Sequence, residues 1–256
     1  MNPWEKGIVC VTGALAAAVL AKLWWSGLVS AYKMLFCYLT ADFLSSVAAV
    51  TIRYDTKRYV DVYFASQTVK IILAAFVLVE IYALALAGTP ALARFGRNVV
   101  SYILGAAALV PVVGLFVDHV PSRIPYLHSF FLFERTMDGT MAIFLIIISI
   151  FMGWFPVRLR RNVIVYIGGF IVWALSRSAL VHIVNQWLGN KQVSMVANSV
   201  QMFIEMGCLL LWLLELRREG ESRTAVVGHL WNRAEAERLT DQLDAINRSL
   251  EHLRRK

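Results

Sequence analysis

Six ionisable side chains lie within long apolar stretches of this chain, where a lipid bilayer would not solvate them. They are Asp42, Lys70, Glu80, Asp138, Arg177 and Glu205. A charge near the centre of a bilayer costs at least about 2.5–3.5 kcal/mol on insertion scales, so such groups should face a bundle interior or water. Gathered there, they could bind a small polar ligand or an ion.

Polar residues recur at helical spacing around these charges. In the segment 194–216 they follow steps of four and three, which places them on one helical face: Ser194, Asn198, Gln201, Glu205, Cys208, Trp212 and Glu215. Shorter runs with the same spacing are Tyr38, Asp42 and Ser45, then Tyr63, Gln67 and Lys70, then Glu134, Asp138 and Met141. The pattern predicts that each of these helices turns one polar face inward.

These faces predict a polar cavity that opens toward the outer side, between segments 31–52, 62–87, 128–154, 163–187 and 194–216. Its expected lining is Asp42, Lys70, Asp138, Arg177, Asn198, Gln201 and Glu205. Arg177 could pair with Glu205 or Asp138, and Lys70 with Asp42 or Asp138. The same residues could instead be structural ion pairs, because lipid provides no hydrophobic force between helices. Both interpretations stay open.

Glu80 stands apart from this predicted cavity. It is about 80° away from the helical face of Lys70 and lies deeper in the same segment. It could exchange protons, or it could simply be a partner for a neighbouring loop.

The elements that must position these groups are membrane-spanning helices. Apolar residues make up 59% of the 256 residues and charged residues 16%, against about 45–50% and about 25% in soluble domains. The mean hydropathy is +0.62. A bilayer core needs about 20 helical residues, and seven segments are long enough: 7–27, 31–52, 62–87, 98–118, 128–154, 163–187 and 194–216. The predicted fold class is therefore all-α, with a seven-helix transmembrane domain over 1–218.

Basic residues indicate how the bundle is oriented. With the C-terminus in the cytoplasm, nine Lys and Arg residues near span ends fall inside and six fall outside. The positive-inside rule then favours an outer N-terminus and a cytoplasmic C-terminus. We expect a multi-pass protein of the bacterial inner (plasma) membrane. The formal charge of +8 is attributed to lipid headgroups, and no nucleic-acid partner is expected.

The C-terminal segment 229–256 carries a heptad repeat. Apolar residues alternate at spacings of three and four: Ala236, Leu239, Leu243, Ile246, Leu250 and Leu253. Residues of both charge signs lie between them, which favours pairing with another helix, in a second copy or a partner, over lying on lipid. We expect a cytoplasmic coiled coil after a flexible linker at 219–228, which includes Gly220.

No catalytic, cofactor or metal motif is found, and neither a cofactor nor a metal is expected. Segment 194–216 has no lysine for a retinal Schiff base, and no pair of histidines has metal-ligand spacing. These observations favour a membrane sensor or scaffold that binds a small polar ligand and signals through its tail. A small-solute or proton-coupled transporter is the alternative, and a membrane-embedded enzyme comes third.

Short motifs add a resemblance to these inferences. They are Tyr63 to Tyr82 with Glu80-Ile81-Tyr82, Leu92 to Arg97, Phe133-Glu134-Arg135, and Leu213 to Arg217. In these the chain resembles a group of bacterial seven-helix integral membrane proteins of similar length, over about residues 33–218. The resemblance implies a topology and carries no function.

Overall fold

The computed structural model describes residues 3–52, 57–87, 98–106, 109, 125–154, 157–186, 191–227, 238, 241, 242, 245 and 248. Six long helices dominate this part of the chain: α1 (Pro3–Trp25), α2 (Lys33–Thr51), α3 (Lys57–Ala85), α5 (Pro125–Trp154), α6 (Arg161–Gln186) and α7 (Lys191–Glu215). Each contains a stretch that is long and apolar enough to cross a membrane. The prediction of a helical, multi-span architecture is confirmed at this level.

The predicted fourth span, 98–118, is described only in part. Residues 98–106 are helical and bury Val100 and Leu104, while Pro111 and most of the remaining segment lie outside the described residues. Helices α3 and α5 both run toward the end of the bundle where α7 finishes. Seven spans therefore stay a prediction, and six candidate spans are found in the described residues.

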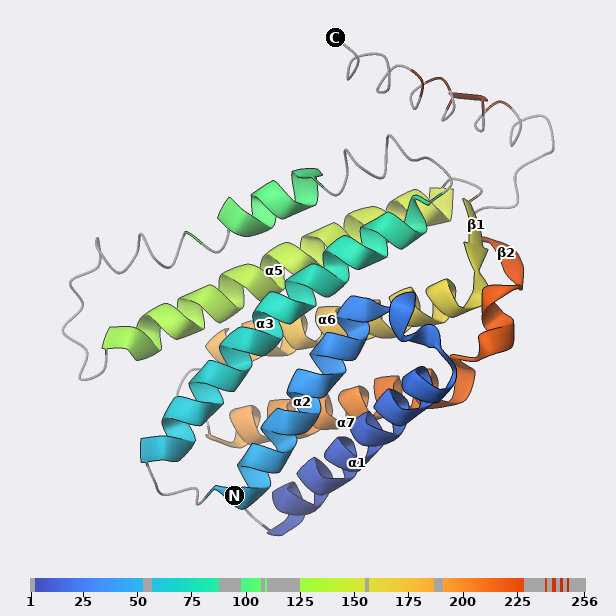
Figure 1. The fold of residues 1–256 in the computed structure, drawn as a ribbon. Helices are drawn as coiled ribbons and strands as arrows, with labels where there is room; N and C mark the ends of the chain where they lie inside the picture. Colours follow the sequence, from blue (N-terminus) through green and yellow to red (C-terminus); the bar gives the residue numbers. More distant parts are fainter. Residues whose placement is uncertain are drawn as a thin grey trace.

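The six helices pack as a closed ring (Figure 1). Contacts join α1 to α2, α2 to α3, α3 to α5, α5 to α6, α6 to α7 and α7 back to α1, and α3 also touches α6 across the ring. At one end, which we call the tail end, the last turn of α1 meets the last turn of α7, where the ammonium group of Lys22 donates to the carbonyl of Leu213. The opposite end, where α1 and α7 begin, is called the cavity end.

Helix α7 illustrates how the sequence specifies this packing. Val196, Val200, Phe203, Leu210 and Leu214 recur on one face and are exposed, as side chains that contact lipid would be. The opposite face carries Asn198, Gln201 and Glu205 and turns toward the other helices. An apolar outer face with a polar inner face fits a multi-pass membrane protein, because only the interior of the bundle offers partners for polar groups.

The core of the tail half is apolar and aromatic. Tyr166 and Phe170 of α6 are fully buried, together with Leu39, Leu78 and Leu145 from three neighbouring helices. Tyr38 packs edge-on against Trp173, with ring centroids 5.4 Å apart. These large side chains fill the space between the cavity and the tail end.

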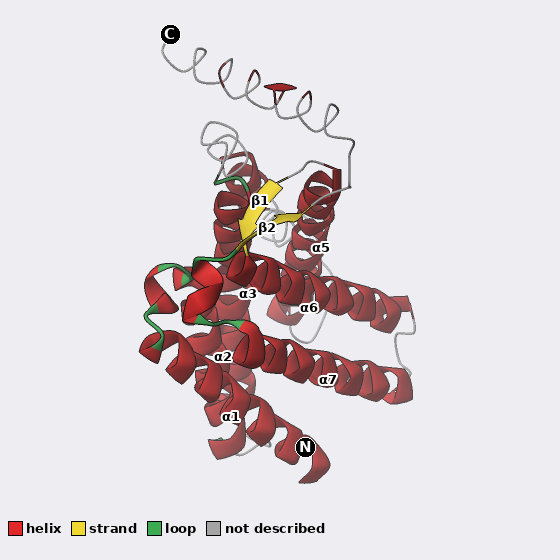
Figure 2. Cartoon of the chain, turned by 90° about the vertical axis from the view of Figure 1, so that its right-hand side faces the viewer, coloured by secondary structure: helices red, strands yellow, loops and turns green. Residues whose placement is uncertain are grey.

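A two-stranded antiparallel ribbon lies at the tail end, and the all-α prediction missed it (Figure 2). Strand β1 (Val157–Arg160) connects α5 to α6, and strand β2 (Thr224–Val227) pairs with it in the register Arg160 opposite Thr224. A short 3-10 helix, η2 (Arg218–Glu221), links α7 to β2. The expected linker, residues 219–228, thus contains most of a 3-10 helix and all of strand β2.

The C-terminal heptad positions Ala236, Leu239, Leu243, Ile246, Leu250 and Leu253 lie outside the described residues. Of that segment, Arg238, Asp241, Gln242, Ala245 and Arg248 have helical backbone and are exposed. The coiled coil remains a prediction from the sequence.

Candidate functional site

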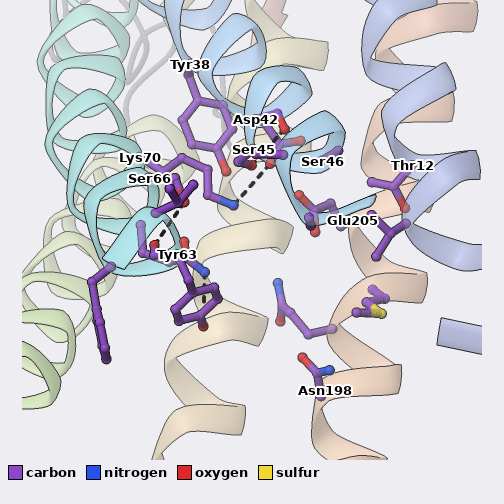
Figure 3. Close-up of a pocket in the computed structure, with 18 of the residues that line it drawn as sticks. Thr12, Tyr38, Asp42, Ser45, Ser46, Tyr63, Ser66, Lys70, Asn198 and Glu205 are labelled. Carbon is purple, nitrogen blue, oxygen red and sulfur yellow. Dashed lines mark hydrogen bonds and ion pairs between the residues drawn. The ribbon is translucent and has the colours of Figure 1, made fainter. Parts of the chain in front are cut away.

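A cavity of about 540 Å³ lies between the helices in the cavity half of the bundle (Figure 3). Five helices line it. The side chains used below are Thr12 of α1, Tyr38, Asp42 and Ser45 of α2, Tyr63, Gln67 and Lys70 of α3, Trp173 and Arg177 of α6, and Asn198, Gln201 and Glu205 of α7. A volume of this size is in the range of small-molecule sites, about 300–1,000 Å³.

Six of the seven predicted lining residues meet at this cavity, namely Asp42, Lys70, Arg177, Asn198, Gln201 and Glu205. The seventh, Asp138, is buried behind it on α5 and reaches it only through Arg177. None of the described side chains of segment 128–154 lines the cavity, whereas Val9 and Thr12 of α1, which were not predicted to line it, do. A lone threonine in an apolar segment gave no periodic signal from which α1 could have been predicted.

Two ion-pair groups neutralise most of the charge around the cavity. The ammonium group of Lys70 lies 3.2 Å from a carboxylate oxygen of Asp42. Arg177 donates from Nε to Asp138 at 2.8 Å and from its terminal nitrogen to Glu134, and its guanidinium lies over the ring of Trp173. Of the pairings that the sequence allowed, Arg177 takes Asp138 and Lys70 takes Asp42, while Glu134 is a third partner that was not foreseen.

The carboxylate of Glu205 belongs to neither of these ion-pair groups. No hydrogen bond or ion pair to it is found in the described part of the chain, although it lies within electrostatic range of Asp42, Lys70 and Arg177. Gln67 and Gln201 also line the cavity, and each has one amide atom that is covered by protein and has no partner among the described residues, Oε1 of Gln67 and Nε2 of Gln201. An unpaired carboxylate on a cavity wall costs free energy unless water or a polar ligand solvates it.

Glu80, which the sequence left open, lies at the tail end and far from the cavity along α3. Its carboxylate accepts the backbone N–H of Met34, in the first turn of α2, at 3.2 Å and the hydroxyl of Tyr166 at 3.0 Å. The first N–H groups of a helix have no partner within the helix, and a carboxylate there is favoured by the helix dipole. Glu80 therefore caps α2 from a neighbouring helix, and a proton-exchanging role is not needed to explain it.

Polar groups at the tail end fasten the ribbon to the bundle. Asn162, which is fully buried, donates to the carbonyl of Arg217 and to the carboxylate of Glu221, both at 2.8 Å. Glu221 also accepts the hydroxyl of Tyr32 at 2.5 Å and pairs with Arg160 at 2.8 Å. We call Tyr32, Arg160, Asn162 and Glu221 the clamp. The clamp joins the loop after α1, the start of α6 and the chain that leaves α7.

Burial and hydrogen bonding set the protonation of the clamp. Burial would by itself raise the pKa of Glu221, but the hydrogen bonds from Tyr32, Asn162 and Arg160 outweigh it and hold that pKa below its ordinary value of 4.5. Burial and the neighbouring Glu221 carboxylate raise the pKa of Tyr32, so its hydroxyl stays a donor at neutral pH.

The ribbon should loosen in acid. Since the pKa of Glu221 is lowered by folding, its stabilisation is complete above pH 4.5 and is lost as the pH falls through the lowered value. Hydrogen exchange at Thr224 to Val227, corrected for intrinsic rates, should rise steeply as the pH falls below 4.5. In Glu221→Gln the exchange should already be faster at pH 7 and lose this dependence, and a profile equal to wild type would contradict the prediction.

The clamp residues could not be predicted from the sequence, because none of them belongs to a repeated pattern. The alternation Val-Arg-Leu-Arg at Val157–Arg160 and the β-branched residues of Thr224–Val227 are the only signals that could have indicated the ribbon. Among the described residues, no group of three or more His, Cys, Asp or Glu side chains is placed to hold a metal ion.

The fold and the cavity thus define a class, a helical protein with six described helices able to span a membrane and a polar cavity lined by described side chains from five of them. Comparison with family models, curated proteins and solved structures finds no match to this chain. The resemblance to bacterial seven-helix proteins therefore remains an expectation from short motifs.

Proposed function

We propose that this protein is a membrane sensor or scaffold that binds a small polar ligand in the cavity and reports it through its C-terminal segment. The observation that carries the proposal is the cavity of about 540 Å³ that contains the unpaired carboxylate of Glu205. The proposed orientation has the N-terminus outside and the C-terminus in the cytoplasm, so the cavity half would face outward.

Helix α7 offers a direct route from the cavity to the tail. It presents Gln201 and Glu205 to the cavity, and about 15 Å further along it Glu215 pairs with Arg161 at 2.5 Å. The chain then enters η2 and β2, where Glu221 and Asn162 belong to the clamp. A small shift of α7 on ligand binding would therefore act on the segment that precedes the heptads.

A transporter is less well supported. Its path would need polar groups that continue to the tail end, but beyond Glu205 the inward face of α7 carries buried Cys208 and Trp212. The aromatic cluster of Tyr38, Phe170 and Trp173 closes the same level. Glu80, a polar group of α3 near the tail end, is engaged as a helix cap. Flux of small solutes into proteoliposomes would overturn the preference for a sensor.

Thermal-shift screening of the full-length protein with small polar compounds tests the proposal that the cavity binds a ligand. A stabilising ligand should raise the melting temperature, because binding to the folded state adds RT ln(1 + [L]/Kd), and Glu205→Ala should remove that shift. This proposal fails if no compound stabilises the protein and Glu205→Ala leaves the phenotype of the host unchanged.

Disulfide cross-linking in membranes tests the proposal that the C-terminal segment associates with a second copy. In a background with Cys10 and Cys37 replaced by serine, a cysteine at Leu243, a predicted core position of the heptads, should cross-link between copies. A cysteine at Asp241, on the outer face of the same helix, is the matched control. Equal cross-linking at both positions, or none in either, would remove self-association of the tail from the proposal.

A further inference from the structure

Among the described side chains around the cavity, the charges do not balance. Two cations, Lys70 and Arg177, lie with four carboxylates, Asp42, Glu134, Asp138 and Glu205. With all six ionised, this part of the bundle has a net charge of −2. A surplus of buried negative charge is unfavourable in a low-dielectric interior, and it favours an occupant that is positively charged.

The surplus negative charge is located at Glu205. Asp42 has its lysine, and Glu134 and Asp138 share Arg177, whereas Glu205 has no hydrogen-bond or ion-pair partner in the described part of the chain. Figure 3 shows Glu205 between the Lys70–Asp42 pair and Thr12. A cation that enters the cavity would meet this carboxylate as the free anionic group.

The lining of the cavity indicates what kind of cation would fit. A primary ammonium has three N–H donors, which can serve the carboxylate of Glu205 and hydroxyl oxygens of the lining such as that of Thr12. Aromatic rings of Tyr38, Tyr63 and Trp173 also line the cavity, and such rings attract organic cations.

We propose that the cavity binds a small organic cation with a primary ammonium group, and that Glu205 anchors the ammonium. This inference rests on the proposed function, since it names the ligand class of the same site. A bare metal ion does not fit, because no cluster of three ligating side chains occurs among the described residues and the volume is large enough for a molecule of several heavy atoms.

The test is a thermal-shift and calorimetric titration of the full-length protein in detergent with four probes of similar size. The probes are 2-aminoethanol (a cation), acetate (an anion), glycine (a zwitterion) and ethylene glycol (neutral). We expect 2-aminoethanol to bind and to raise the melting temperature. Glu205→Gln should weaken its binding about 30-fold or more, the effect of leaving a buried ammonium without its charge partner.

Glu215→Gln is the matched control, because it removes a carboxylate from the same helix but outside the cavity, and it should leave the affinity for 2-aminoethanol unchanged. Glu205→Asp keeps the charge on a shorter side chain and should bind with intermediate affinity. Glu205→Gln without ligand should melt no lower than wild type, because it removes an unpaired buried charge. The melting temperature of Glu205→Gln without ligand therefore shows whether a loss of binding is caused by a loss of folding.

The outcomes distinguish the two proposals. Stabilisation by acetate but not by 2-aminoethanol would overturn the cationic ligand class while leaving the cavity as a binding site. Equal binding of 2-aminoethanol to wild type and Glu205→Gln would overturn the role of Glu205 as anchor. Failure of all four probes, and of a wider screen of polar compounds, would overturn ligand binding itself and with it the proposed function.

Discussion

Replacing Arg177 with glutamine is expected to destabilise the helix bundle by about 3–5 kcal/mol, because it leaves two buried carboxylates without a counter-ion. Arg177 donates from separate nitrogens to Asp138 and to Glu134, and the side chain of Asp138 is only 3% exposed. No other cation is within ion-pair distance of either carboxylate in the described part of the chain. Unfolding in mixed micelles of mild detergent and sodium dodecyl sulfate would measure the loss.

Two companion variants separate charge from shape. Arg177→Lys keeps the charge, but a single ammonium group cannot reproduce two directed N–H bonds from a planar guanidinium, so an intermediate loss is expected. The triple variant Glu134→Gln, Asp138→Asn, Arg177→Gln removes all three charges together and should recover most of the stability, since an uncharged buried group of the same shape has no missing partner. A triple variant as unstable as Arg177→Gln alone would contradict this account.

The inward faces of the helices could be predicted, because helical spacing is a local property of the sequence. On α7 the steps of four and three from Asn198 to Glu205 place those residues together whatever the helix packs against, and the structure has them on one cavity. The same holds for Asp42 and Lys70 on their own helices. Periodicity indicates which face of a helix is polar, and burial of that face follows from the cost of polar groups in lipid.

The choice of partners could not be predicted in the same way. Arg177 could have reached Glu205 or Asp138, and the decision depends on how α5, α6 and α7 are placed around the ring, which no single helix encodes. The contribution of α1 was missed for the same reason, since Thr12 is a lone polar residue that becomes part of a wall only when α1 packs between α2 and α7.

The ribbon was missed because its two strands are short and far apart in the sequence. Four residues on each side give too little alternation to stand out, and Val157 and Val227 pair across 70 positions. The side chain that fastens them, Asn162, lies one residue before the predicted span 163–187. Gly220 was interpreted as a flexible link, whereas it is buried against Asn162, so its lack of a side chain serves a close contact.

Because of that contact, Gly220→Ala is expected to weaken the attachment of the ribbon strongly, which is the second large effect. The backbone at Gly220 has no positive φ angle, so alanine would not strain it, but the new Cβ would overlap the side-chain oxygen of Asn162. Asn162 would have to move and give up its bonds to Arg217 and Glu221. At about 0.5–1.5 kcal/mol for each net hydrogen bond, detachment of the ribbon should become easier by about 2–3 kcal/mol.

Limited trypsin digestion can measure this opening, because Arg217, Arg218 and Arg223 lie in the segment that would detach. When opening is fast, cleavage follows the population of the open form, so Gly220→Ala should be cut about 30-fold faster than wild type. Gly207→Ala, where nothing lies within 4 Å of the added Cβ, should be cut at the wild-type rate.

The pairing of Gly220 with Asn162 can be isolated by a double-mutant cycle. Asn162→Ala alone should also speed cleavage, because it removes the same hydrogen bonds. Adding Gly220→Ala to Asn162→Ala should then have little further effect, since the atom that the methyl group would overlap is gone. If the two substitutions were additive, the close contact would not be what holds the ribbon, and the link between α7 and the tail would have to rest on the Arg160–Glu221 ion pair and the strand pairing alone.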